Sequence, residues 1–435
     1  MNIIEINEKS KMKDLYNKVS GVDKDYFRHR IDENLPPHSF LRHDTKPDLI
    51  KTTYGTGKTE WTIPKKGFMA KMFIKHVIKY DSADEAEAID TDALNGPSDI
   101  LGAYIFKKME LTQHNNTIES LNPIGIIERV NTSLFNNIVN IKTAMTPDNT
   151  FIGDELIFYT PLLFSLNSDI NHFLDMKHLQ EIKLSVENES YLSLGLERAE
   201  VPGENPGDPP AVEAINIKKH TMILMADFMS IKDYEEYSKE SFSKPQMVAI
   251  ENCVLESGKE FNLVGGVNTL RLRAKDLVKK IVFKNISTLP TRKEIDTYDL
   301  KLTSRNEIIY EAETLLESLL FSKNYQGLVS HKVPDATDDG IFEIQFEIPN
   351  FRNSNSGCLN LDELHKDLTL NIRSNNDSRL YINYFTYEML IVKPNGLIEK
   401  ADPNNNTAYL DDYRYEEPKK SNPDVKEIEE AKDIE

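Results

Sequence analysis

The feature that most constrains the fold of this chain is an internal repeat. Residues 59–77 (TEWTIPKKGFMAKMFIKHV) align without a gap over residues 268–286 (NTLRLRAKDLVKKIVFKNI). Along this alignment apolar positions coincide, as where Trp61 falls on Leu270, and three lysines of the first segment meet lysines of the second. A chain that carries one pattern twice is expected to contain two copies of one folding unit.

A second correspondence follows in the same order. Residues 158–186 run parallel to residues 346–372, with a change of two residues in the offset. Phe158 aligns with Phe346, and a proline follows three residues later in each copy. Each half therefore has a strand that ends at a proline, a polar crossing and an alternating strand, and the two halves are interpreted as copies of one β-unit.

From Asp48 onward the chain consists of short segments rich in aromatic and β-branched residues, several in alternating pattern, and separated by turn-rich stretches. Helical patterns are short, at residues 232–242 and 315–328. Many short strands with turn-like breaks indicate sandwiches or jelly rolls rather than an α/β enzyme. The predicted fold class is all-β, with two tandem eight-stranded antiparallel jelly rolls and short helical interludes.

The predicted organisation has five parts. They are an N-terminal arm with a short amphipathic helix at 1–24, a first jelly roll at 25–230, a connecting helix and linker at 231–260, a second jelly roll at 261–402 and a charged C-terminal tail at 403–435.

The N-terminal arm carries an apolar face in a locally basic segment. Such a helix either packs on its own domain or contacts a membrane or a neighbouring subunit. The residues of this face are Met12, Leu15, Tyr16 and Val19.

One short motif suggests nucleotide binding. Gly57-Lys58-Thr59 matches the end of a phosphate-binding loop, G-x-x-x-x-G-K-[ST]. However, Thr52 stands where the first glycine is required, and Pro64 would interrupt the helix that must follow. The motif is therefore interpreted as the turn into a strand, and its counterpart in the second copy, GGVNTLRL, has no such lysine.

The composition of the chain and its lack of known catalytic motifs indicate a protein without enzymatic activity. A net charge of −19 argues against a sequence-specific nucleic-acid partner, and the two cysteines fit neither a disulfide framework nor a zinc site. No H-E-x-x-H or G-x-S-x-G motif is present. With no apolar run of about 18 residues and no signal-like N-terminus, the chain is expected to be synthesised as a soluble protein. We predict no enzymatic activity, catalytic residue, cofactor or metal.

From Tyr54 to Ala401 the chain resembles the double jelly-roll major capsid proteins of icosahedral DNA viruses. This lineage includes the large nucleocytoplasmic DNA viruses, virophages and polinton-like viruses, and tailless membrane-containing phages. The resemblance lies in an I-P-x-x-G turn at 63–67, the proline-centred segment 158–164, the segment NSGCLNLDELHKDLTLNI and the closing INYFTYEMLIVKPNGLIEKA. The tryptophan-rich crossing of the large eukaryotic viruses is absent, because Trp61 is the only tryptophan.

The resemblance implies a viral major capsid protein that forms pseudo-hexagonal homotrimers, which tile an icosahedral shell around the genome. The implied partners are the chain itself, minor capsid and penton proteins and, as a further candidate, an internal membrane; the implied location is the virion. The polar insertions 82–99 and 197–214 are candidates for the outer surface or for clamps between subunits. The alternatives are a tandem jelly roll that binds or acts on carbohydrate, and a minor or vertex capsid protein.

Overall fold

The structure of the chain is a computed structural model. The predicted helices at 1–24 (with Met12, Leu15, Tyr16 and Val19), 232–242 and 315–328 lie outside the described residues, as does the tail at 403–435. The described residues are 38–53, 56–91, 100–132, 138–146, 151–165, 174–200, 213–231, 245–273, 277–287, 297–304, 307–313, 341–346, 359–360 and 368–400.

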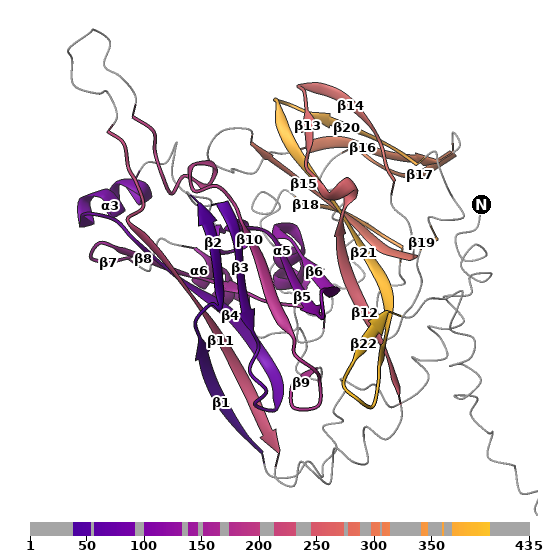
Figure 1. The fold of residues 1–435 in the computed structure, drawn as a ribbon. Helices are drawn as coiled ribbons and strands as arrows, with labels where there is room; N and C mark the ends of the chain where they lie inside the picture. The colour runs from indigo at the N-terminus through magenta and orange to yellow at the C-terminus, as the bar shows by residue number, and fades with distance from the viewer. Residues whose placement is uncertain are drawn as a thin grey trace, which may run out of the picture. The chain divides into compact units, whose positions relative to one another are not determined.

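The first half of the chain forms two antiparallel sheets (Figure 1). One has the strand order β1-β11-β4-β8-β7, with β9 paired to β4, and the other has the order β2-β3-β10-β5-β6. The strands are β1 (His38–Thr45), β2 (Leu49–Thr53), β3 (Thr56–Thr62), β4 (Phe68–Lys79), β5 (Phe106–Gln113), β6 (Asn116–Leu121), β7 (Phe151–Ile152), β8 (Glu155–Pro161), β9 (Leu174–Asp175), β10 (Lys183–Asn188) and β11 (Lys219–Ile231).

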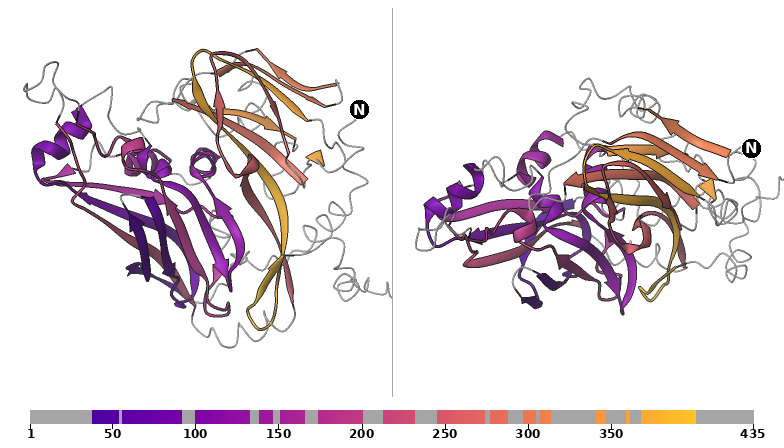
Figure 2. Two further views of the ribbon diagram at one scale, coloured as in Figure 1. Left: turned by 45° about the horizontal axis from the view of Figure 1, so that its top comes forward. Right: turned by 90° about the horizontal axis from the view of Figure 1, so that it is seen from above.

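The second half repeats this arrangement, and Figure 2 shows its salmon-to-yellow strands beside those of the first half. One sheet has the order β12-β21-β15-β18, with three short strands attached, and the other has the order β14-β20-β16-β17. The strands are β12 (Gln246–Leu255), β13 (Phe261–Leu263), β14 (Gly266–Arg271), β15 (Leu277–Ser287), β16 (Thr297–Ser304), β17 (Glu307–Ala312), β18 (Ile341–Gln345), β19 (Leu359–Asn360), β20 (Thr369–Ser374), β21 (Ser378–Val392) and β22 (Ile398–Lys400).

The two halves have the same topology. Eight strands of each half are equivalent, and we number them 1 to 8 along the chain. They are β1, β3, β4, β5, β6, β8, β10 and β11 in the first half, and β12, β14, β15, β16, β17, β18, β20 and β21 in the second. In both halves one sheet then has the order 1-8-3-6 and the other the order 2-7-4-5. This is the connectivity of a jelly roll, in which two Greek keys form a double sheet. The predicted fold of two tandem eight-stranded antiparallel jelly rolls is therefore confirmed.

The repeat in the sequence corresponds to equivalent strands. Phe68 begins β4 and its aligned residue Leu277 begins β15, the third strand of each roll. The second correspondence is correct where β10 aligns with β20 and wrong at its start. Phe158 lies inside β8, whereas Phe346 follows the last residue of β18, so these two phenylalanines are not equivalent.

One predicted boundary differs from the structure. Residues 246–255, assigned to the connecting helix and linker, form β12, the first strand of the second roll, and pair with β21 along their whole length. Within the polar insertion 82–99, residues 83–91 form helix α3 (Ala83–Thr91). β12 pairs only with the last long strand of its roll, so its partner lies far along the chain and no local hairpin signal marks it.

Three further helices of the described residues pack on strands of the first roll, namely α4 (Leu101–Tyr104) and α6 (Ile138–Met145) on β8, and α5 (Pro123–Thr132) on β5. The start of α5 follows from its sequence, Asn122-Pro123-Ile124-Gly125. Pro123 occupies the first helical position, where no backbone N–H is needed, and Asn122 Oδ1 accepts the N–H of Gly125 at 2.9 Å. This cap fixes the direction in which α5 leaves the sheet.

The core extends from the first roll into one sheet of the second. Strand β15 alternates, with Ile281 and Phe283 in the second roll's own core and Val282 and Ile286 packed in the cluster that also contains Trp61 of the first roll. The sheet that contains β15 and β21 is therefore buried on both faces. This agrees with the sequence of β21, SRLYINYFTYEMLIV, in which apolar residues stand at adjacent positions and not only at alternate ones.

Candidate functional site at the junction of the two rolls

The described residues that pack between the two rolls include several buried polar and charged side chains, and we treat this junction as the candidate functional site. The first roll contributes β6 and α5, and the second contributes β12, β15 and β21. At the edge strand β6, the Ser120 N–H donates to Asn252 Oδ1 (3.2 Å) and the Ser120 hydroxyl donates to the carbonyl of Cys253 (3.3 Å). Side chain and backbone of β12 thus cover an edge that would otherwise need another strand.

Arg129, on α5, is the most connected residue of the junction. Its guanidinium donates to Glu119 Oε1 at 2.7 Å, to the carbonyl of Leu163 at 2.6 Å and to the carbonyl of Glu251 at 2.6 Å. Burial alone would lower the pKa of Arg129, but the carboxylates of Glu119 and Glu251 raise it above its ordinary value. One buried cation therefore connects α5 and β6 of the first roll to β12 of the second.

Two lysines of β15 complete the ionic part of the junction. Lys280 Nζ lies 2.6 Å from Glu128 Oε1 of α5, with both side chains buried, and 4.5 Å from the ring centre of Phe385. Lys279 Nζ lies 2.7 Å from Glu251 Oε2. Burial acts to raise the pKa of Glu251, but the charges of Lys279, Lys280 and Arg129 outweigh it and lower the pKa to about 2. Glu251 is therefore ionised at neutral pH, and its contribution to stability is lost only as the pH falls from 4.5 toward 2.

Neutral groups pack closely in the centre of the junction. Asn122 Nδ2 donates to Asn383 Oδ1 of β21, and an added Cβ on Gly125 would lie 2.8 Å from the sulfur of Cys253. Burial raises the pKa of the Cys253 thiol to about 12, so it stays protonated and unreactive at neutral pH. Cys253 is therefore a packing residue.

The β21–β22 hairpin of the second roll also contacts the first roll. The carbonyl of Gly396 accepts the backbone N–H of Gln180 and the side-chain amide of Gln113, each at 3.0 Å, and Gln113 Oε1 accepts the N–H of Ile398 at 2.7 Å. Gly396 has a φ of +79°, and an added Cβ would overlap the carbonyl oxygen of His178. The hairpin tip can approach this closely only because residue 396 is glycine.

Replacing Gly396 with alanine is therefore expected to weaken the junction. The positive φ costs about 1 kcal/mol, and the overlap with His178 adds about 1–3 kcal/mol. Gly258→Ala is the matched control, because Gly258 has a similar φ of +65° but open space around the Cβ position. Urea unfolding of both variants measures the difference, and equal losses of stability would show that the hairpin is not tightly docked.

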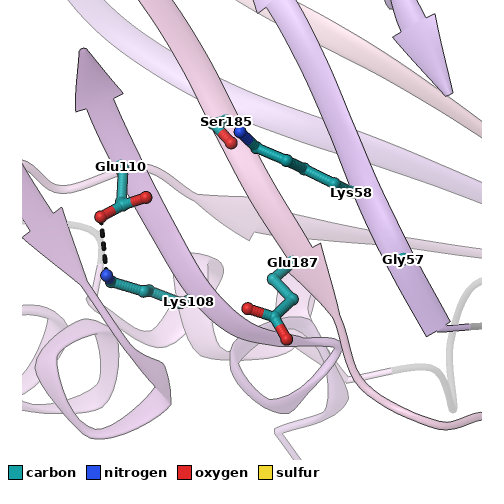
Figure 3. Close-up of a pocket in the computed structure, with 6 residues that line it drawn as sticks. All are labelled: Gly57, Lys58, Lys108, Glu110, Ser185 and Glu187. Carbon is teal, nitrogen blue, oxygen red and sulfur yellow. Dashed lines mark ion pairs between the residues drawn. The ribbon is translucent and has the colours of Figure 1, made fainter. Parts of the chain in front are cut away.

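The Gly57-Lys58-Thr59 motif lies elsewhere, inside β3, and Figure 3 shows its Gly57 and Lys58 on one strand. It is thus part of the strand itself rather than the turn before it, and β3 is followed by β4 rather than by a phosphate-facing helix. Lys58 pairs with Glu60 at 2.7 Å, Lys108 of β5 pairs with Glu110 at 2.7 Å, and Glu187 of β10 lies opposite both lysines. These side chains line a depression of about 240 Å³ on the sheet surface. The charges compensate one another, which fits a polar outer face and not a phosphate site.

The junction was not predicted from the sequence, although a signal for it exists. Lys71 of β4 and Lys280 of β15 occupy the same position of the repeat, yet Lys71 is exposed and Lys280 is buried. The lysines look alike in the sequence, and only the packing of the first roll on β15 separates them. The predicted site residues Met12, Leu15, Tyr16 and Val19 lie outside the described residues, so that prediction stays open.

No described helix combines the length and the apolar character needed to cross a bilayer. In the same part of the chain, no group of three or more histidine, cysteine or carboxylate side chains is placed to hold a metal ion.

Comparison with known proteins identifies the fold. No family model matches the sequence, and neither does any curated protein. Among solved structures, the chain is similar to the capsid of the virus PBCV-1, with a TM-score of 0.58, 14% identity and coverage of 84% of this chain and 97% of the other. It is also similar to the Faustovirus major capsid protein, with a TM-score of 0.53, 9% identity and coverage of 83% and 92%. The chain thus has the double jelly-roll fold of viral major capsid proteins.

Proposed function

We propose that this protein is a viral major capsid protein that self-assembles into pseudo-hexagonal homotrimers and, through them, into an icosahedral shell. The observation that carries this proposal is that one jelly-roll topology occurs twice in the chain, at coverage close to the full length of the PBCV-1 capsid chain. Three chains with two similar rolls each present nearly sixfold edges, which can tile a shell. The role is structural, without an enzymatic step.

The buried junction supports this proposal physically. A tile keeps its shape only if its two rolls cannot rotate against each other, and buried charges with several fixed acceptors define one arrangement. At the junction Arg129, Glu251 and Lys280 are all held in this way. The joined rolls also lose less association entropy on assembly than separate subunits would.

The finer parts of the proposal concern location and partners. We place the protein in the virion, in contact with further copies of itself, with minor capsid and penton proteins and with an internal membrane. The N-terminal face of Met12, Leu15, Tyr16 and Val19 is the proposed contact with a membrane or a neighbouring subunit.

The proposal predicts the native mass of the purified protein. A homotrimer of a 49.9 kDa chain has a mass of about 150 kDa, and an obligate assembly should keep it on dilution. Size-exclusion chromatography with light scattering over a range of concentrations measures this. A stable monomer of 49.9 kDa that binds glycans would contradict the proposal and favour a carbohydrate-binding protein. Electron microscopy of particles that contain the chain would test the shell itself.

A further inference from the structure

Two histidines in the interior of the first roll form a hydrogen-bonded chain that the capsid proposal does not use. His76 lies on β4 and is fully buried, and His220 lies on β11 and is partly buried. His76 Nδ1 is 3.0 Å from His220 Nε2, and His76 Nε2 is 3.0 Å from the Thr160 hydroxyl on β8. The other ring nitrogen of His220 is 2.7 Å from the Tyr191 hydroxyl, just before the 3-10 helix η1 (Leu192–Leu194).

The carbonyl at the Thr160 end of this hydrogen-bonded series determines which atom carries each proton. The carbonyl of Gly102 on α4 can only accept, so the Thr160 hydroxyl donates to it. Thr160 must then accept from His76 Nε2–H, which leaves His76 Nδ1 as an acceptor for His220 Nε2–H. His220 Nδ1 in turn accepts from the Tyr191 hydroxyl. With both imidazoles neutral, only this arrangement satisfies every group.

Protonation disturbs this chain. One added proton makes both nitrogens of one ring donors, so in either case His220 Nδ1–H must donate to Tyr191 and the Tyr191 hydroxyl must turn away. A second proton would place the N–H groups of His76 and His220 against each other across 3.0 Å. The histidine chain therefore satisfies all of its hydrogen bonds when both imidazoles are neutral, and it cannot keep the His76–His220 hydrogen bond when both are protonated.

The surroundings offer no compensating anion at hydrogen-bond distance in the described part of the roll. Phe158 of β8 stacks on His76 at 4.6 Å, and Phe106 of β5 lies 5.3 Å away, so both sheets contribute apolar rings. Tyr191 is the ionisable neighbour of the pair, and the nearby carboxylate, Glu197, acts on Tyr191 and Tyr80. Burial lowers the pKa of His220 to about 4, and burial and the charge of His220 lower the pKa of His76 well below its ordinary value.

We propose that this histidine chain is an acid-sensitive lock in the first roll. At neutral pH it holds α4 and the segment around Tyr191 against the sheet of β4, β8 and β11, and protonation at acid pH releases them. Gly102 shows how close this packing is, because an added Cβ there would overlap the carbonyl oxygen of Tyr159. The lock lies within one roll of one chain, so it does not depend on the proposed assembly.

The sign of the pH dependence follows from the direction of the shifts. The unfolded chain binds protons at these histidines from about pH 6.5 downward, whereas the folded chain resists protonation until about pH 4. The stabilisation is complete above pH 6.5 and is lost as the pH falls between these values. Each histidine is expected to raise the unfolding equilibrium constant by up to about tenfold per pH unit in this window, and the pair by up to about 100-fold.

Urea unfolding of the full chain at several pH values tests the lock. In His220→Gln, the side-chain amide can still donate to His76 but cannot titrate, so we expect up to about tenfold less change per pH unit than in the wild type. His114→Asn is the control, because His114 is exposed in the β5–β6 turn, where its φ of +49° suits asparagine. This variant should keep the wild-type pH dependence.

A second measurement does not depend on a variant that folds. In the wild-type protein with nitrogen-15 in its histidine rings, NMR should show His76 and His220 as neutral Nε2–H tautomers at neutral pH. They should stay neutral at about pH 5.5, where an ordinary imidazole is mostly charged. Titration of both rings near pH 6.5, or an unchanged pH dependence in His220→Gln, would overturn the proposal.

Discussion

Replacing Arg129 with alanine is expected to lower the free energy of unfolding by about 3–5 kcal/mol, because the change removes one partner of a buried ionic cluster. The guanidinium satisfies Glu119 and the carbonyls of Leu163 and Glu251, and alanine leaves these acceptors in the interior without it. Since the acceptors come from both rolls, we expect the junction to loosen as a unit.

The measurement is urea unfolding at one fixed protein concentration, with native mass recorded for the same samples. Arg42→Ala is the matched control. Arg42 pairs with Asp44 at 2.8 Å, but both side chains are about half exposed (56% and 49%), so its loss should cost less than about 1 kcal/mol. A loss of similar size in both variants would mean that the Arg129 cluster does not hold the rolls together.

The strands and the duplication could be predicted from the sequence because both depend on local pattern. Alternation places Met72 and Ile74 of β4 inside the roll, and the aligned Ile281 and Phe283 of β15 lie inside the second roll. Side chains in a strand alternate between its two faces, so a period-2 pattern reports burial directly.

The first strand of each roll could not be predicted in this way. β1 and β12 each pair with the last long strand of their roll, so neither belongs to a hairpin that turn residues would mark. In β1 the described side chains are exposed or half-buried, and Leu41 is 61% exposed. Tertiary pairing, not local apolar alternation, makes this segment a strand.

The junction between the two rolls could not be predicted from the sequence for a related reason. A lysine on the outward face of a strand is normally exposed, and Lys71 is exposed. At the aligned Lys280 the outward face meets the first roll, and Glu128 of α5 supplies the counter-charge. Which copy of the repeat is covered depends on how the rolls pack, and the repeat pattern itself carries no information on that.

The Lys280–Glu128 pair allows a sharper test, since its two partners lie on different rolls. Lys280→Met alone is expected to cost about 3–5 kcal/mol, because it removes the cation that lies 2.6 Å from the buried Glu128 carboxylate. Glu128→Leu alone should cost a similar amount, because it removes the carboxylate that lies 2.6 Å from the buried Lys280 ammonium. Urea unfolding of each variant measures these losses.

The double variant Lys280→Met/Glu128→Leu separates stability from specificity. Apolar pairs of similar size often replace buried ion pairs with no loss, or with a gain of about 1–4 kcal/mol, so the double variant should be far more stable than either single one. If the pair instead fixes the register of the two rolls, the double variant should unfold normally yet form fewer trimers and show faster hydrogen exchange in α5 and β15. If the double variant loses as much free energy of unfolding as the two single variants together, the two residues act independently, which would contradict an energetic coupling of this pair.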